Sequence, residues 1–135
     1  MASAAAEIPS DFMDLLTTKK ALAHLAMVLK DGAPQVTPVW FGYADGRLRF
    51  VAQTWTMKAK TLQEGAKVAV AVVDPDNPYR YIQLRGIVEA ITADGAEDYV
   101  DHLSMKYLGK PYPYKEPGQE RRIFVILPER VQVLA

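Results

Sequence analysis

Two stretches of the chain have the hydrophobic patterns of β-strands. Over residues 81–92 apolar and polar positions alternate, which is the period of a strand with one buried face. The apolar positions are Ile82, Leu84, Gly86, Val88 and Ala90, and the polar ones include Gln83, Arg85 and Glu89. Residues 67–73 are apolar throughout after the initial lysine, and this short run predicts a buried strand.

The stretch from residue 35 to residue 60 predicts two strands joined by a tight turn, followed by a loop and two lysines. Its strand-favouring residues are Val36, Trp40, Phe41, Tyr43 and Val51. Asp45-Gly46 lies between the apolar runs and is a strong hairpin signal, because glycine accepts a positive φ. Pro38 has no N–H for a ladder hydrogen bond, so its strand should be bulged or at a sheet edge.

Residues 21–29, ALAHLAMVL, fit either a helix or a strand. Alanine, leucine and methionine favour a helix, whereas the short length and the stop at Asp31-Gly32 favour a strand, which we prefer. As a strand it would be nearly apolar on both faces, so both faces would need to be covered.

Helix signals occur at three places. Ser10 is expected to cap a short helix at the start of the chain. A second short helix is expected over residues 58–64, because Gly65 is a natural C-terminal residue. Asp94 is expected to cap a third helix that continues to about residue 108.

The remaining segments predict two loops and two strands. The loops cover residues 74–79, which contain two prolines, and residues 109–118, which are rich in aromatic residues and proline. Further strands are expected over residues 122–127 and 131–134. The fold class is therefore mainly β (α+β): six or seven strands linked by hairpins in a small antiparallel barrel, with short helices outside it. Residues 1–8 are expected to be a flexible tail, and residues 9–135 a single domain.

Composition excludes several classes of function. The chain has 135 residues, no cysteine and a formal net charge of zero, so disulfides, thiol catalysis and iron–sulfur clusters are excluded. The neutral balance points to neither nucleic acid nor a membrane surface as a partner. His24 and His102 are far apart and show no metal-ligand spacing, so no metal site is expected. We expect a cytoplasmic protein.

Candidate reactive residues are few. Ser104 is not in a nucleophile turn, and His24, on an apolar run, is expected to be a hydrogen-bonded core or interface residue. Lys58 and Lys60 could be a solvated helix start or could bind an anion. Aromatic residues such as Trp40 and Trp55 are usually core or rim residues, but beside a basic patch they also suit a flat anionic cofactor.

Two segments, PQVTPVWFGYADGRLRFVAQT and MKAKTLQEGAKVAVAVVDPDNPYRYIQLRG, resemble the split β-barrel flavin/deazaflavin oxidoreductase superfamily. This is the superfamily of pyridoxamine 5′-phosphate oxidase, and the resemblance is to its coenzyme F420-dependent group. It covers roughly residues 21–134. It implies a six-stranded split barrel and a homodimer with two sites at the interface.

The resemblance also implies a set of cofactor-binding residues. One strand would lie against the deazaflavin ring, and a basic segment would hold the phosphate and tail. The implied residues are Gln35, Val36, Thr37, Pro38, Val39 and Trp40 in the strand, and Thr56, Met57, Lys58 and Lys60 in the basic segment. Where the family pattern has two arginines and an asparagine, this chain has Thr56, Lys60 and Thr61, which makes the anion clamp thinner.

The function implied is an oxidoreductase that uses reduced coenzyme F420 to transfer a hydride to a small conjugated or unsaturated acceptor. Tyr79 and Arg80 are the candidates for supplying a proton, and solvent is the other source. The alternatives are an FMN-dependent enzyme like pyridoxamine phosphate oxidase, or a non-catalytic cofactor- or haem-binding protein of the same fold.

Overall fold

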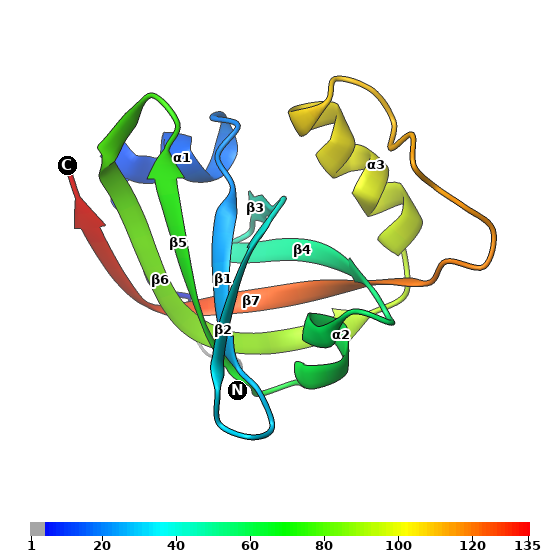
Figure 1. Cartoon of the computed structure of the whole chain (residues 1–135). Helices are drawn as coiled ribbons and strands as arrows, with labels where there is room; N and C mark the ends of the chain where they lie inside the picture. The colour runs from blue at the N-terminus through cyan, green and yellow to red at the C-terminus, as the bar shows by residue number, and fades with distance from the viewer. Residues whose placement is uncertain (1–4) are drawn as a thin grey trace.

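Figure 1 shows the fold in a computed structural model, which describes residues 5–135. The strands of this part of the chain are β1 (Ala23–Val28), β2 (Pro34–Val39), β3 (Gly42–Ala44), β4 (Arg47–Gln53), β5 (Lys67–Asp74), β6 (Asn77–Thr92) and β7 (Arg121–Leu134). The helices are the 3₁₀ helix η1 (Ser10–Phe12), α1 (Met13–Thr17), α2 (Met57–Thr61) and α3 (Ala96–Tyr107). The predicted fold class, mainly β with short helices outside an antiparallel split barrel, is confirmed.

All seven strands form one antiparallel sheet in the order β2-β1-β5-β6-β7-β4-β3. The predicted hairpin over residues 35–53 is therefore wrong in one respect. Its first strand is divided at Trp40-Phe41 into β2 and β3, which lie at opposite edges of the sheet. The turn at Asp45-Gly46 is confirmed, with φ of 54° and 75°, and joins β3 to β4. Pro38 lies in an edge strand, as predicted.

The segment that fitted either a helix or a strand forms β1. It pairs with β2 on one side and β5 on the other, and these pairings override the helix propensity of its residues. Ala23, Leu25 and Met27 are buried, whereas His24 and Val28 are exposed on the opposite face. A core position for His24 is therefore wrong within the single chain, and its interface position stays a prediction.

The turn between β5 and β6 is tighter than the loop predicted over residues 74–79. Asp74 pairs directly with Asn77, so β6 begins at Asn77. The two strands predicted near the C-terminus are one continuous strand, β7, because a register shift accommodates Pro128 opposite Gly86. Gly86 is required there: a Cβ atom would lie 2.0 Å from the carbonyl oxygen of Leu127.

The helices differ from the predictions at their ends. Ser10 begins a 3₁₀ helix and makes no capping hydrogen bond, and α2 ends at Thr61 rather than at residue 64. The α3 helix begins after Gly95 in a left-handed conformation, so Asp94 is not its cap. No helix within residues 5–135 is long and apolar enough to cross a membrane.

The core lies between the inner face of the curved sheet and the N-terminal helices. Its largest fully buried side chains include Phe41, Phe50 and Phe124, and the last two stack with ring centroids 4.9 Å apart. Within the predicted N-terminal tail, the N–H of Ala6 donates to the carbonyl of Pro128 at 2.8 Å, and Ile8 is buried. Residues 1–4 of that tail lie outside the described residues.

Candidate functional site

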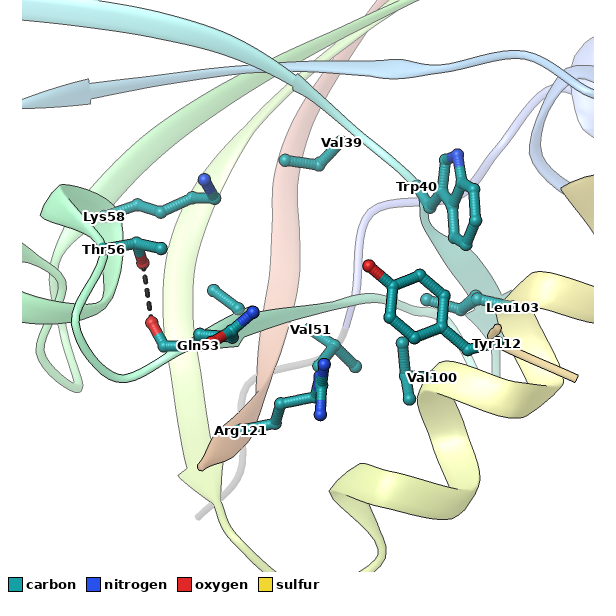
Figure 2. Close-up of a pocket in the computed structure, with 11 residues that line it drawn as sticks. Val39, Trp40, Val51, Gln53, Thr56, Lys58, Val100, Leu103, Tyr112 and Arg121 are labelled. Atoms are coloured by element: carbon teal, nitrogen blue, oxygen red, sulfur yellow. Dashed lines mark hydrogen bonds between the residues drawn. The ribbon is translucent and has the colours of Figure 1, made fainter. Parts of the chain in front are cut away.

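A cavity of about 270 Å³ lies between residues of β2 and β4, beside α3 (Figure 2). In the sheet order β2 is one edge and β4 is next to the other edge, so the sheet must curl to bring them to the same cavity. β3 pairs with β4 only as far as Arg49. Beyond that residue β4 pairs with β7 alone. The cavity therefore lies at the split of the barrel, where two strands have unpaired edges.

Side chains from several separate segments line this cavity. They are Val39 and Trp40 at the end of β2, Val51, Ala52 and Gln53 in β4, Thr56 and Lys58 around the start of α2, Val100 and Leu103 in α3, and Tyr112 and Arg121 beyond it. Apolar side chains and one flat aromatic wall form most of this surface, with a few polar groups. This is the usual character of a small-molecule site.

The aromatic wall is built around Trp40. Its indole stacks on Tyr107, with ring centroids 5.1 Å apart and planes 4° apart, and meets Tyr112 edge-on at 6.0 Å. The Tyr107 hydroxyl donates to the carbonyl of Ala21 and accepts the N–H of Phe41 at 3.4 Å. Burial raises the pKa of Tyr107 to about 12, so this phenol stays protonated and structural. The stacking and hydrogen bonds of Tyr107, at the end of α3, therefore hold the aromatic wall in place.

Two cations line the cavity, and one of them is neutralised. Arg121, with 4% of its side chain exposed, donates from Nη1 to both carboxylate oxygens of Glu97 at 3.0 Å. Its Nη2 donates to Gln119 at 2.7 Å. Lys58 is half-buried and has no ion pair with any of residues 5–135. Lys58 therefore supplies the unbalanced positive charge of the cavity.

Thr56 has a local structural role at the edge of the cavity. Its hydroxyl donates to the carbonyl of Gln53 at 2.8 Å (Figure 2). It also accepts the N–H of Ala59 at 3.3 Å, which caps α2. The cap fixes the start of α2 and hence the position of Lys58. Thr56 therefore has a structural role at the start of α2.

The structure brings four of the ten predicted cofactor-binding residues to the cavity: Val39, Trp40, Thr56 and Lys58. Along β2 the side chains alternate: Gln35 and Thr37 are half-buried on the same face as Val39, whereas Val36 and Pro38 are exposed on the other. Met57 and Lys60 are exposed outside the cavity lining. Lys58 and Lys60 point to different sides because residues two apart on a helix do not share a face.

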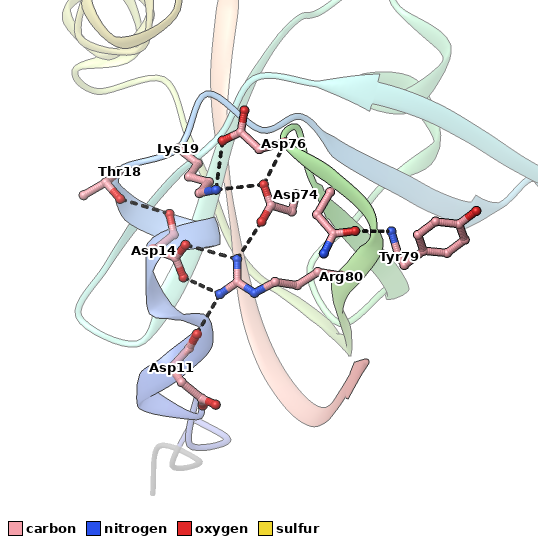
Figure 3. Close-up of polar contacts among 9 residues, drawn as sticks. Asp11, Asp14, Thr18, Lys19, Asp74, Asp76, Tyr79 and Arg80 are labelled. Atoms are coloured by element: carbon pink, nitrogen blue, oxygen red, sulfur yellow. Dashed lines mark hydrogen bonds and ion pairs between the residues drawn. The ribbon is translucent and has the colours of Figure 1, made fainter. Parts of the chain in front are cut away.

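The two predicted proton donors lie elsewhere, at the turn between β5 and β6 (Figure 3). Tyr79 is 78% exposed. Arg80 donates to the carboxylates of Asp14, at 2.7 Å, and Asp74, at 2.9 Å. The hydrogen bonds that Arg80 donates, first to Asp14 and then to Asp74, raise the pKa of Arg80, so its proton is held more tightly. Neither residue lines the cavity.

Asp74 is the centre of this ion cluster. Its side chain is 5% exposed, and Lys19 donates to it at 2.9 Å. The hydrogen bond from Lys19, then that from the backbone N–H of Asp76, lowers its pKa to about 2. The cluster ties the N-terminal helices to the turn between β5 and β6. Within residues 5–135, no group of three or more His, Cys, Asp or Glu side chains could hold a metal ion.

Several lining residues were not identified from the sequence. Tyr112 and Arg121 come from the loop after α3 and the start of β7, and Val100 and Leu103 come from α3. The signal available in the sequence was segment 109–118, which is rich in aromatic residues and proline and contains Tyr112 and Tyr114. In Figure 2 the hydroxyl of Tyr112 points into the cavity.

Comparison with known proteins gives a consistent picture. Residues 11–135 match the family model described as pyridoxamine 5′-phosphate oxidase. An F420 reductase is similar in structure, with 34% sequence identity and a TM-score of 0.80 over 93% of this chain and 98% of that chain.

Two further structures share the fold at lower identity. HupZ of Group A Streptococcus is 21% identical, with a TM-score of 0.67 over 95% of this chain and 94% of that one. The FAD and heme binding protein from Mycobacterium smegmatis is 23% identical, with a TM-score of 0.68 over 96% of this chain and 71% of that one. A comparison with curated proteins gave no match.

Proposed function

Because the chain belongs to the pyridoxamine 5′-phosphate oxidase family, as the resemblance in its sequence indicated, we propose that it is an oxidoreductase that uses reduced coenzyme F420. Its substrate class is a small conjugated or unsaturated acceptor. The observation that carries the proposal is the similarity to an F420 reductase, at 34% identity along nearly the full length of both chains.

The residues around the cavity fit a flat anionic ring system. The cavity, about 270 Å³, is near the lower end of the range of about 300–1,000 Å³ for ligand pockets. It therefore suits a ring better than a ring with its whole phosphate-bearing tail. Trp40 offers an aromatic surface, and the unpaired edge of β2 offers backbone N–H and C=O groups for in-plane hydrogen bonds.

The charges of the site support the same ligand. Glu97 neutralises Arg121, so Lys58 is the residue that would attract an anionic tail leaving the cavity. When bound, the reduced deazaflavin supplies the hydride. The chain's own residues would orient the ring, exclude water and hold a proton near the acceptor.

Tyr112 replaces Tyr79 and Arg80 as the proposed proton source. Its hydroxyl points into the cavity (Figure 2), whereas the hydroxyl of Tyr107 is engaged with Ala21 and Phe41. A phenol at the cavity can donate a hydrogen bond to the acceptor and then its proton. Solvent would restore that proton.

We also propose that two copies form a dimer through the outer face of β1 and β2. The exposed apolar residues on and beside these strands are Leu22, Val28 and Val36. Ala26 and Val36 are paired across the two strands, so the apolar positions are contiguous. Such a face on a soluble chain indicates an interface.

The test is a titration of the purified protein with F420 and, separately, with FMN, followed by absorbance and intrinsic tryptophan fluorescence. We expect saturable quenching of Trp40 by F420, with weaker binding of FMN. Tighter binding of FMN would replace the proposal with an FMN-dependent enzyme. Absence of binding by both would refute cofactor use at this cavity.

A further inference from the structure

Two arginines are paired across neighbouring strands on the outer surface of the sheet, away from the cavity. Arg85 of β6 pairs directly with Arg130 of β7 in the antiparallel register, and both side chains are exposed. Strands β6 and β7 run side by side in Figure 1. Like charges directly opposite one another on neighbouring strands are destabilising. A compensating anionic partner would therefore stabilise the pair.

No such partner lies within residues 5–135. Arg85 and Arg130 make neither an ion pair nor a side-chain hydrogen bond there. Each of the other five arginines makes at least one such contact. These contacts are Arg47 with Glu89, Arg49 with the carbonyl of Ala44, Arg80 with Asp14, Arg121 with Glu97, and Arg122 with the carbonyl of Arg121. The two opposed guanidiniums thus have ten N–H donors without an acceptor in the described chain.

Neighbouring residues extend this donor surface. Gln83 pairs with Gln132 in the adjacent row of the same face, so two amides lie beside the two guanidiniums. On the other side, Ala69 pairs with Arg85, and its small side chain leaves a hollow. Arg85 and Arg130 line both concavities on this face, of about 220 Å³ and about 740 Å³.

The charge of this surface is positive. Lys67 lines the larger concavity with the two arginines, and Glu129 is the one carboxylate there. Glu129 forms no ion pair with them within residues 5–135. A tetrahedral oxyanion has enough acceptor oxygens to bridge two facing guanidiniums, whereas one carboxylate satisfies a single guanidinium fork.

We propose that Arg85 and Arg130, with Gln83 and Gln132, form a surface binding site for phosphate or a phosphate ester. The site is separate from the cavity at the barrel split and does not depend on the function proposed for it. Binding would convert a repulsive cross-strand pair into one bridged by a shared anion, and would thereby stabilise the pairing of β6 and β7.

The test uses the full chain labelled with ¹⁵N, with the arginine Nε–Hε signals followed during titration with inorganic phosphate at constant ionic strength. We expect saturable shifts of Arg85 and Arg130, and an affinity about tenfold or more weaker in Arg85→Gln and in Arg130→Gln. Arg47→Gln is the matched control: it makes the same charge change at an arginine paired with Glu89, and should leave phosphate affinity unchanged.

Thermal unfolding gives a second readout. Phosphate should raise the Tm of the wild type more than chloride does at equal ionic strength, and this difference should disappear in Arg85→Gln.

The proposal is overturned if phosphate causes no saturable shift of the arginine NMR signals, or if Arg47→Gln weakens phosphate binding as much as Arg85→Gln. Equal affinity for succinate would also overturn the assignment to phosphate. A dimer that dissociates on Arg85→Gln without any phosphate response would identify the arginines as partner contacts instead.

Discussion

The indole of Trp40 lies parallel to the ring of Tyr107, with centroids 5.1 Å apart and planes 4° apart. Trp40 lies in the short segment between the end of β2 and the start of β3, and Tyr107 is the last residue of α3. The Tyr107 hydroxyl also bonds the backbone of Ala21 and Phe41. The Tyr107 side chain therefore holds three parts of the chain in place: the residue before β1, the segment between β2 and β3, and the aromatic wall of the cavity.

Replacing Tyr107 with phenylalanine should separate these roles. Tyr107→Phe keeps the stacked ring but leaves the half-buried N–H of Phe41 and the carbonyl of Ala21 without their hydroxyl partner. We expect the free energy of unfolding in urea to fall by about 1–3 kcal/mol, with cofactor affinity nearly unchanged. Tyr79→Phe, at a residue 78% exposed, is the control and should alter neither quantity. Equal stability of the two variants would mean that these hydrogen bonds contribute nothing net.

The strands that could be predicted from the sequence are those whose pattern is local. The alternation in β6 and the apolar run of β5 each lie within one element, and both strands are present. Strand boundaries that depend on pairing with a strand far away in the sequence were not predictable. The division between β2 and β3 follows from their pairing with β1 and β4 at opposite sheet edges. The continuity of β7 past Pro128 depends on Gly86 in another strand.

The same distinction applies to the candidate site. Trp40 and Lys58 were predictable because they lie in one continuous segment that resembles the family. Tyr112 and Arg121 reach the cavity only through the packing of α3 on β4 and β7. Neither residue type nor spacing indicates that packing. The tyrosine-rich segment 109–118 was visible in the sequence, but its location was not.

The ion cluster at Asp74 should make stability depend on acid pH. Its pKa falls from 3.8 to about 2 on folding, so the folded state favours the ionised carboxylate. This stabilisation is complete above pH 3.8 and is lost as the pH falls towards about 2. The difference in unfolding free energy between the wild type and Asp74→Asn should therefore shrink over that interval, measured by urea unfolding at each pH.

The control for that prediction is Asp76→Asn, in the same turn. Asp76 also contacts Lys19, but its side chain is 79% exposed. Its substitution should change stability little and with no comparable pH dependence. A constant difference between the wild type and Asp74→Asn from neutral pH to about pH 2 would contradict the assigned ionisation.

The outer face of β1 and β2 should hold two copies together. Sedimentation at micromolar concentration should give about twice the mass of one chain. Val36 is 63% exposed, so Val36→Lys should place a charge within the interface and shift the equilibrium towards monomer. Met105→Lys, at an exposed apolar position on α3, is the control and should leave the mass unchanged. A wild-type monomer at this concentration would exclude the interface.

Tyr112 should affect turnover more than binding. Tyr112→Phe removes the hydroxyl that points into the cavity but keeps the ring beside Trp40. Loss of general acid catalysis typically costs about 10²–10⁴-fold in rate, so we expect kcat to fall by about a hundredfold while F420 affinity stays within about threefold. The measurement is steady-state reduction of an unsaturated acceptor, with cofactor affinity measured separately. Tyr79→Phe should retain the wild-type rate, and a comparable loss in that variant would restore the turn between β5 and β6 as the proton source.

Lys58 should hold the anionic tail of the cofactor. It lines the cavity without an ion pair from residues 5–135, while the charge of Arg121 is balanced by Glu97. One charge-assisted contact contributes about 1.5–3 kcal/mol, or roughly ten- to hundredfold in affinity. Lys58→Ala should weaken F420 binding by that factor with little change in stability, and Lys58→Arg should retain binding. Added salt should weaken the wild type, because the contact is partly open to water.

Lys60→Ala is the matched control, because it removes the same charge from the same helix at an exposed position outside the cavity lining. If the contact is local, fluorescence titration at two salt concentrations will give near wild-type affinity for Lys60→Ala and a reduced salt dependence only for Lys58→Ala. Equal losses in the two variants would instead indicate a general electrostatic attraction by α2. Unchanged affinity in Lys58→Ala would mean that the tail leaves the cavity along another wall.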